Sequence, residues 1–102
     1  MADLIEITSY DYGAHSSQGT GGSTWFIRLW SASGFLGSAL FMKDATLLGA
    51  GKYVGGYVLY YDNGDLPWVV DMLRNEKPVY LSYDRGNAWL KTTQEPIGEG
   101  EI

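Results

Sequence analysis

Residues 29–42 read LWSASGFLGSALFM and residues 53–61 read YVGGYVLYY, and neither stretch contains Asp, Glu, Lys or Arg. A strand with one face in water alternates apolar and polar side chains. These two stretches do not alternate cleanly, so we expect both of their faces to contact a core, a helix, a partner chain or a ligand. Together with eight Tyr, four Trp and three Phe in 102 residues, they predict a mainly β domain.

Outward from these stretches, apolar and β-branched runs bounded by turn residues predict six strands. The predicted strands are Leu4–Tyr10, Thr24–Ser31, Phe35–Met42, Tyr53–Asp62, Pro78–Tyr83 and Ala88–Thr93. Ser31–Gly34 predicts a tight hairpin turn, and the Gly55-Gly56 pair predicts a β-bulge or a close backbone approach.

One helix is predicted over Pro67–Asn75, behind an N-terminal Pro. Its apolar stripe consists of Trp68, Val69, Met72 and Leu73. A single helical turn over Asp44–Leu48 is also compatible with the sequence, with Asp44 as its cap. A helix of about 14 Å is too short to cover a whole sheet face. We therefore predict an α+β, mainly β fold: about six antiparallel strands in a strongly bent sheet or small barrel, with one short helix at about 67–75.

The length predicts a single β-rich domain over residues 1–94, followed by a weakly ordered acidic tail over 95–102. The absence of cysteine excludes disulfides and fits a cytoplasmic location. The N-terminal residues lack the features of a signal peptide, and no apolar run is long enough to span a membrane. A net charge of −5 without any Lys/Arg cluster argues against nucleic-acid and membrane-surface partners.

Residues 11–23, DYGAHSSQGTGGS, are predicted to form a long polar loop that is mobile in the free protein. The loop holds Asp, His and Ser, but a hydrolytic triad needs these groups on separate rigid elements. Its glycines lack the Lys and the following helix of a phosphate-binding loop. The loop is therefore a candidate for binding, through Tyr12, His15 and Ser16, more than for catalysis.

Metal and cofactor sites are not predicted. His15 is the only histidine, so a multi-His metal site is impossible. Asp62, Asn63 and Asp65 lack the calcium-loop spacing. We expect them to form a strand end, a type I′ turn and a helix cap.

The aromatic residues are divided between core and surface. We assign Trp25, Phe35, Phe41, Trp68 and Trp89 to the core. In the strand over 53–62, we expect Val54, Val58 and Tyr60 to face the core, because β-branched side chains pack well there, and Tyr57, Leu59 and Tyr61 to face outward. Eight Tyr exceed what a small core accommodates with every hydroxyl satisfied, so several should be exposed.

The sequence thus predicts a small non-catalytic binding or interaction protein whose partner is a protein or a second copy of the chain. The candidate binding residues are Tyr57, Tyr61, Tyr12, His15 and Ser16. An alternative is a carbohydrate- or small-ligand-binding β module that uses exposed Tyr and Trp rings. An enzyme that uses the 11–23 loop is the least favoured alternative, and no catalytic residue, cofactor or metal is predicted.

Overall fold

The chain folds into two β-sheets and one α-helix, in a computed structural model that describes residues 3–14, 23–43 and 49–92. The strands are β1 (Asp3–Ile7), β2 (Ser9–Ala14), β3 (Ser23–Ser31), β4 (Gly34–Met42), β5 (Gly51–Tyr53), β6 (Gly56–Asp62), β7 (Val79–Asp84) and β8 (Asn87–Thr92). The helix α1 (Leu66–Asn75) follows a single 3₁₀ turn, η2 (Asn63–Asp65).

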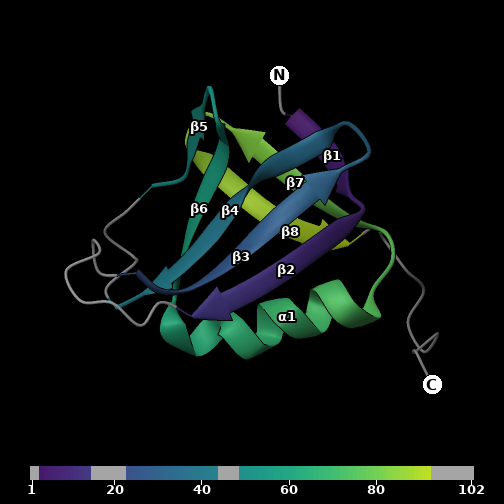
Figure 1. Ribbon diagram of the computed structural model, residues 1–102. Helices are drawn as coiled ribbons and strands as arrows, with labels where there is room; N and C mark the ends of the chain where they lie inside the picture. Colours follow the sequence, from purple (N-terminus) through teal and green to yellow (C-terminus); the bar gives the residue numbers. More distant parts are fainter. Residues whose placement is uncertain (1–2, 15–22, 44–48, 93–102) are drawn as a thin grey trace.

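The larger sheet has the strand order β2-β3-β4-β6-β5 and the smaller sheet the order β1-β7-β8. All neighbouring strands are antiparallel except β4 and β6, which are parallel. The two sheets face each other, and α1 runs along one open side of the pair (Figure 1). A mainly β fold with one short helix is confirmed, but the described strands form two sheets and not a closed barrel.

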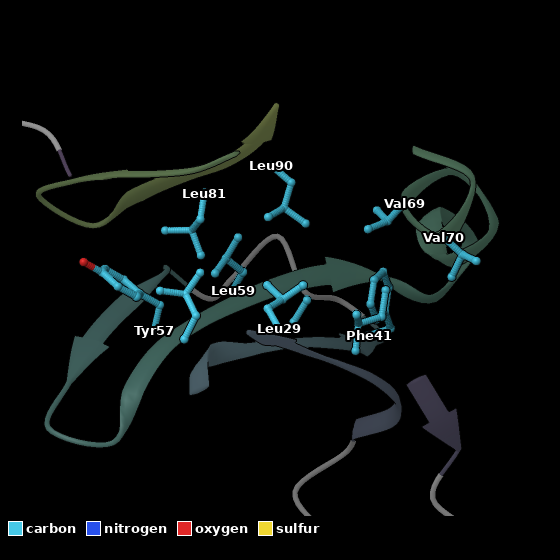
Figure 2. Packing of buried hydrophobic residues seen from close by; sticks show 11 residues of the cluster. Leu29, Phe41, Tyr57, Leu59, Val69, Val70, Leu81 and Leu90 are labelled. Atoms are coloured by element: carbon cyan, nitrogen blue, oxygen red, sulfur yellow. The ribbon is translucent and has the colours of Figure 1, made fainter. Parts of the chain in front are cut away.

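The core fills the space between the sheets and the helix (Figure 2). The larger sheet contributes Ile27, Leu29, Leu36, Ala39, Phe41, Tyr57 and Leu59, the smaller sheet Leu81 and Leu90, and α1 contributes Val69 and Val70. The ring of Phe41 stacks on that of Tyr61 at a centroid distance of 5.3 Å. Burial of these side chains is the main driving force for holding the two sheets together.

The connection between β5 and β6 differs from the bulge predicted at Gly55-Gly56. Val54 and Gly55 form the tight turn of a hairpin, so the predicted bulge at Gly55-Gly56 is wrong. The first residue of β6, Gly56, has φ +128°, and a Cβ there would come within 2.7 Å of the Leu36 carbonyl oxygen. A close backbone approach was the alternative prediction for Gly55-Gly56, and the approach of Gly56 to β4 confirms it.

The next connection also differs from the expected one. Asn63 and Gly64 belong to the 3₁₀ turn, not to a type I′ turn, and the Asp65 side chain makes no capping hydrogen bond. The helix itself lies where it was predicted. No helix among the described residues is long and apolar enough to cross a membrane.

The boundary between the predicted first strand and the predicted loop is wrong. Leu4–Tyr10 is not one strand, because the chain passes from the smaller sheet to the larger one at Thr8. The first residues of the predicted 11–23 loop belong to β2, where each is paired with β3. The last residue of that loop, Ser23, begins β3. Residues 15–22, the predicted helical turn over 44–48 and the tail over 95–102 lie outside the described residues.

The two faces of β6 are the reverse of those predicted. Tyr57 is 7% exposed and Leu59 2% exposed, whereas Val58 is half-buried and Val54 is exposed in the hairpin turn. The reason is the parallel pairing with β4, which places Tyr57, Leu59 and Tyr61 beside Gly37, Ala39 and Phe41. Of these residues, Figure 2 shows Tyr57, Leu59 and Phe41 on the side of the sheet where Leu81 of β7 and Leu90 of β8 lie.

Four of the five aromatic residues assigned to the core are exposed. Phe41 is fully buried, but Phe35 is 50%, Trp89 55% and Trp68 73% exposed, and Trp25 also reaches the surface. The space between the sheets is filled mainly by Leu, Ile and Val side chains. In α1, Val69 and Val70 are buried instead of Trp68. Four of these five rings therefore lie at the surface and not between the sheets.

Candidate functional site

The outer face of the larger sheet is the side turned away from β7 and β8, and no described helix or strand covers it (Figure 1). The strand register fixes its composition, because residues directly opposite each other point to the same side. Three cross-strand rows lie on it: Ser9, Trp30 and Phe35; then Asp11, Arg28, Ser38 and Val58; then Gly13, Phe26, Leu40 and Tyr60. Aromatic and apolar side chains thus surround one ion pair.

That ion pair is formed by Arg28 and Asp11 on neighbouring strands. The Arg28 guanidinium donates two hydrogen bonds to the Asp11 carboxylate, at 2.9 Å and 2.6 Å. This hydrogen bonding lowers the pKa of Asp11 and raises that of Arg28. Both groups are charged at neutral pH, and the pair has no net charge.

The same guanidinium lies between two aromatic rings. Its central carbon is 5.7 Å from the ring centroid of Phe26 and 5.6 Å from that of Trp30. A planar cation over such rings is attracted by their negative faces. The Phe26 ring in turn lies over Gly13, where a Cβ would come within 2.9 Å of it. The middle of the outer face is therefore an ordered arrangement of rings around a neutralised cation.

Phe35 joins this face because of an irregularity in β4. Trp30 is opposite Phe35, but the preceding residue, Leu29, is opposite Gly37, so β4 has one extra residue there. Such a bulge changes the side to which the following side chains point. It places Phe35 against Trp30 in an edge-to-face contact with ring centroids 5.8 Å apart.

A groove between β2 and α1 is the second candidate site. A cleft of about 630 Å³ lies between residues 6–10 and the C-terminal part of α1. A cleft of about 250 Å³ lies between the N-terminal part of α1 and the rings of Tyr12 and Trp25. Arg74 lines both clefts, so the two are neighbours along the side of the helix, and we call them together the β2–α1 groove.

A polar cluster links the two sheets at β1 and β6. Asp3 accepts hydrogen bonds from the Tyr57 hydroxyl and, at 2.9 Å, from the Lys52 ammonium. These bonds, first that from Tyr57, lower the pKa of Asp3. Burial, followed by the hydrogen bond to Asp3, raises the pKa of Tyr57. The cluster thus provides a hydrogen-bond partner for the hydroxyl of the buried Tyr57 ring and links β1 to β6.

The predicted binding residues do not form one site. Tyr12 is exposed in the groove, Tyr57 is a core residue, and Tyr61 is half-buried against Phe41. Burial, together with the charge of Asp65, raises the pKa of Tyr61 to about 12. His15 and Ser16 lie outside the described residues.

Several surface residues were missed by the sequence interpretation, chiefly Trp30, Phe35 and Arg74. The alternation of Phe26, Arg28 and Trp30 along β3 was the available signal for the outer face, because a cation between two rings is typical of an exposed strand face. No comparable signal existed for Phe35, whose orientation depends on the bulge.

Within the described ranges, no three His, Asp or Glu side chains come together to hold a metal ion. Comparisons of the chain with models of protein families, with curated proteins and with solved structures gave no match.

Proposed function

We propose that this protein is a non-catalytic, cytoplasmic interaction domain that self-associates through the outer face of its larger sheet. The observation that carries the proposal is the arrangement of Trp30, Phe35 and Phe26 around the Arg28–Asp11 pair, on a face that no described element covers. Aromatic residues and Arg are the residue types enriched at protein interfaces, where they supply most of the binding energy.

The charge distribution supports a second copy as the partner. The chain carries a net charge of −5, so two copies repel each other at most orientations. The middle of the outer face is different, because Arg28 is neutralised by Asp11 on its own chain. Two such faces can meet without placing like charges opposite each other, which would otherwise oppose association.

The dimensions also fit a dimer. Five strands at about 4.8 Å spacing, with central strands of nine residues, give a face of roughly 20 by 30 Å. A stable interface buries about 800 Å² on each partner. The outer face thus has an area of the required order.

Sedimentation velocity over a range of concentrations tests the proposal with a matched pair of variants. Phe35→Ser removes a ring from the outer face, and Trp89→Ser removes a similarly exposed ring from the smaller sheet. We expect Phe35→Ser to shift the equilibrium to monomer and Trp89→Ser to leave it unchanged. A wild-type monomer at all concentrations, or equal effects of the two variants, would show that this face does not mediate self-association.

Carbohydrate binding through exposed Tyr and Trp stays a prediction. The rings on the outer face pack against a guanidinium and against each other, an arrangement that favours a protein surface over a sugar ring.

A further inference from the structure

The groove between β2 and α1 contains backbone hydrogen-bonding groups that the described fold leaves unpaired. β2 is an edge strand, and among the described residues it is hydrogen-bonded only to β3. In an antiparallel edge strand, about half of the N–H and C=O groups point away from the neighbour. In Figure 1, α1 runs alongside this strand, and Ser9, Tyr10 and Tyr12 of β2 line the clefts between them. A strand that is paired on one side directs its remaining backbone groups to the other side, which here is the side of the groove.

The edge of β2 lacks the side chains that usually prevent strand addition, and the two clefts leave space between this edge and α1. Exposed edges are commonly protected by Lys, by Pro or by an inward-pointing charge. β2 reads SYDYGA and has no Lys and no Pro. Its one charged residue, Asp11, is held by Arg28 on the outer face. An extended chain can therefore approach this edge.

The walls of the groove indicate which side chains such a segment would carry. Near the N-terminus of α1, Tyr12 and Trp25 lie across from Pro67 and Val70 in a mainly apolar recess of about 250 Å³. Asp71 and Arg74 also line this recess. This recess suits one large apolar or aromatic side chain. It lies at the end of β2 that leads to Ala14.

Arg74 supplies a cation at the middle of the groove. No carboxylate among the described residues forms a salt bridge with it, and Asp71, one turn earlier in α1, is hydrogen-bonded to Asn75. The other charged side chains of the groove, Glu6, Glu76 and Lys77, line the cleft at the C-terminal end of α1. A carboxylate on the added segment would find the Arg74 donors available for bidentate hydrogen bonding.

We propose that the β2–α1 groove binds an extended peptide segment of a partner protein, which adds to the edge of β2 as a further strand. The segment places a large apolar or aromatic side chain in the recess beside Tyr12 and Trp25, and an acidic side chain next to Arg74. Main-chain hydrogen bonds provide affinity in this mode of recognition, and the recess and the cation provide specificity. A β2 of six residues spans about 20 Å, which accommodates a segment of similar length.

This site is independent of the proposed dimer interface. Tyr12 and Trp25 point to the inner side of the larger sheet, whereas Asp11 and Arg28 point to its outer face. The two proposals can therefore succeed or fail separately.

Nuclear magnetic resonance titration of the ¹⁵N-labelled full chain tests the groove. The probe is a blocked hexapeptide of alternating Thr and Val that contains one Trp and one Glu. The comparison peptides replace the Glu by Gln, or one central residue by Pro, which removes a ladder hydrogen bond. We expect the first peptide to shift the amides of Ser9–Ala14, the indole N–H of Trp25 and the amides of α1, and the Pro-containing peptide to bind much more weakly.

Two charge variants test the position of the acidic side chain. Arg74→Ala should weaken binding of the Glu peptide by about threefold, the size expected for an exposed ion pair, and should leave the Gln peptide nearly unaffected. Lys91→Ala removes a cation from the smaller sheet and should change neither affinity.

Three results would overturn the proposal. The first is the absence of shifts in β2, and the second is equal binding of the Pro-containing peptide. The third is a groove already filled by the chain itself. In that case the full chain binds no peptide, and a variant ending at Thr92 shows shifts in β2 and α1 and gains binding.

Discussion

Replacement of Leu59 by Ala should destabilise the protein far more than replacement of its neighbour Val58. Leu59 is 2% exposed and lies in the cluster between the two sheets, as Figure 2 shows. Val58 is half-buried and points to the outer face. Because both residues belong to β6, the comparison keeps the strand and its backbone pairing constant.

The expected magnitudes follow from burial. Leu59→Ala removes a fully packed side chain and leaves a cavity, which costs about 2–5 kcal/mol of the free energy of unfolding. A domain of this length has about 5–15 kcal/mol in total. At roughly 4–8 °C for each kcal/mol, Tm should fall by about 10 °C or more. Val58→Ala should cost about 1 kcal/mol or less.

Urea unfolding followed by tryptophan fluorescence measures both values, at concentrations low enough to keep the chain monomeric. Unchanged m-values would show that the variants differ in stability and not in the extent of unfolding. If Val58→Ala lost as much stability as Leu59→Ala, or more, the assignment of the two faces of the larger sheet would be refuted, and with it the exposure of the outer face.

Three further predictions concern particular residues. Gly56→Ala should lose about 1–3 kcal/mol because of its positive φ and the nearby Leu36 carbonyl, whereas Gly55→Ala, with open space around it, should be close to neutral in thermal unfolding. The pKa of Asp3 is lowered in the folded protein, so its interactions stabilise the fold above the usual carboxyl pKa of 3.8, and this stabilisation is lost as pH falls through the lower folded-state pKa. A plot of the free energy of unfolding against pH should therefore be flatter below pH 3.8 for Tyr57→Phe than for wild type. Parallel curves for the two proteins would contradict this. The pKa of Tyr61 is about 12 instead of the usual 10, so the buried phenol stabilises the fold below pH 10, and this contribution is lost as pH rises toward 12. In an ultraviolet titration, Tyr61→Phe should lack the tyrosinate that forms at the highest pH in wild type. Loss of a tyrosinate that forms at lower pH would be inconsistent with the burial of Tyr61.

The elements with local signals were predictable from the sequence. The β3–β4 hairpin and its turn residues were found, as were α1 and the β7–β8 hairpin, because turn chemistry and periodicity act over a few residues. The division into two sheets was not predictable. It depends on the parallel pairing of β4 with β6 and on the crossing at Thr8, and neither contact leaves a local pattern.

The location of the aromatic residues was harder still. The stripe of α1 was predicted to include Trp68, yet the helix is rotated so that Val69 and Val70 face the core. Phe35 was assigned to the core because the bulge at Leu36, which directs its ring to the outer face, has no signal in the sequence. Size and hydrophobicity favoured burial of these rings, but the narrow space between the sheets holds mostly aliphatic side chains.

The candidate sites, too, depend on contacts between distant segments more than on local sequence patterns. Tyr12 was predicted to lie in a loop, but it lies in β2 beside the groove, and its role in binding stays a prediction. Arg74 could be recognised only after α1 was placed next to β2. Both proposed sites depend on which surfaces the packing of distant segments leaves uncovered, and a single sequence does not record that.

Cross-linking through a single introduced cysteine tests the proposed self-association most directly. The chain contains no cysteine, so Ser38→Cys places one thiol at the centre of the outer face, and Ser82→Cys places one on the outer side of the smaller sheet. With a short bis-maleimide reagent, Ser38→Cys should give a covalent species of twice 11.3 kDa in high yield, and Ser82→Cys should remain monomeric. Equal yields for the two variants, or cross-linking only through Ser82→Cys, would contradict association through the outer face of the larger sheet.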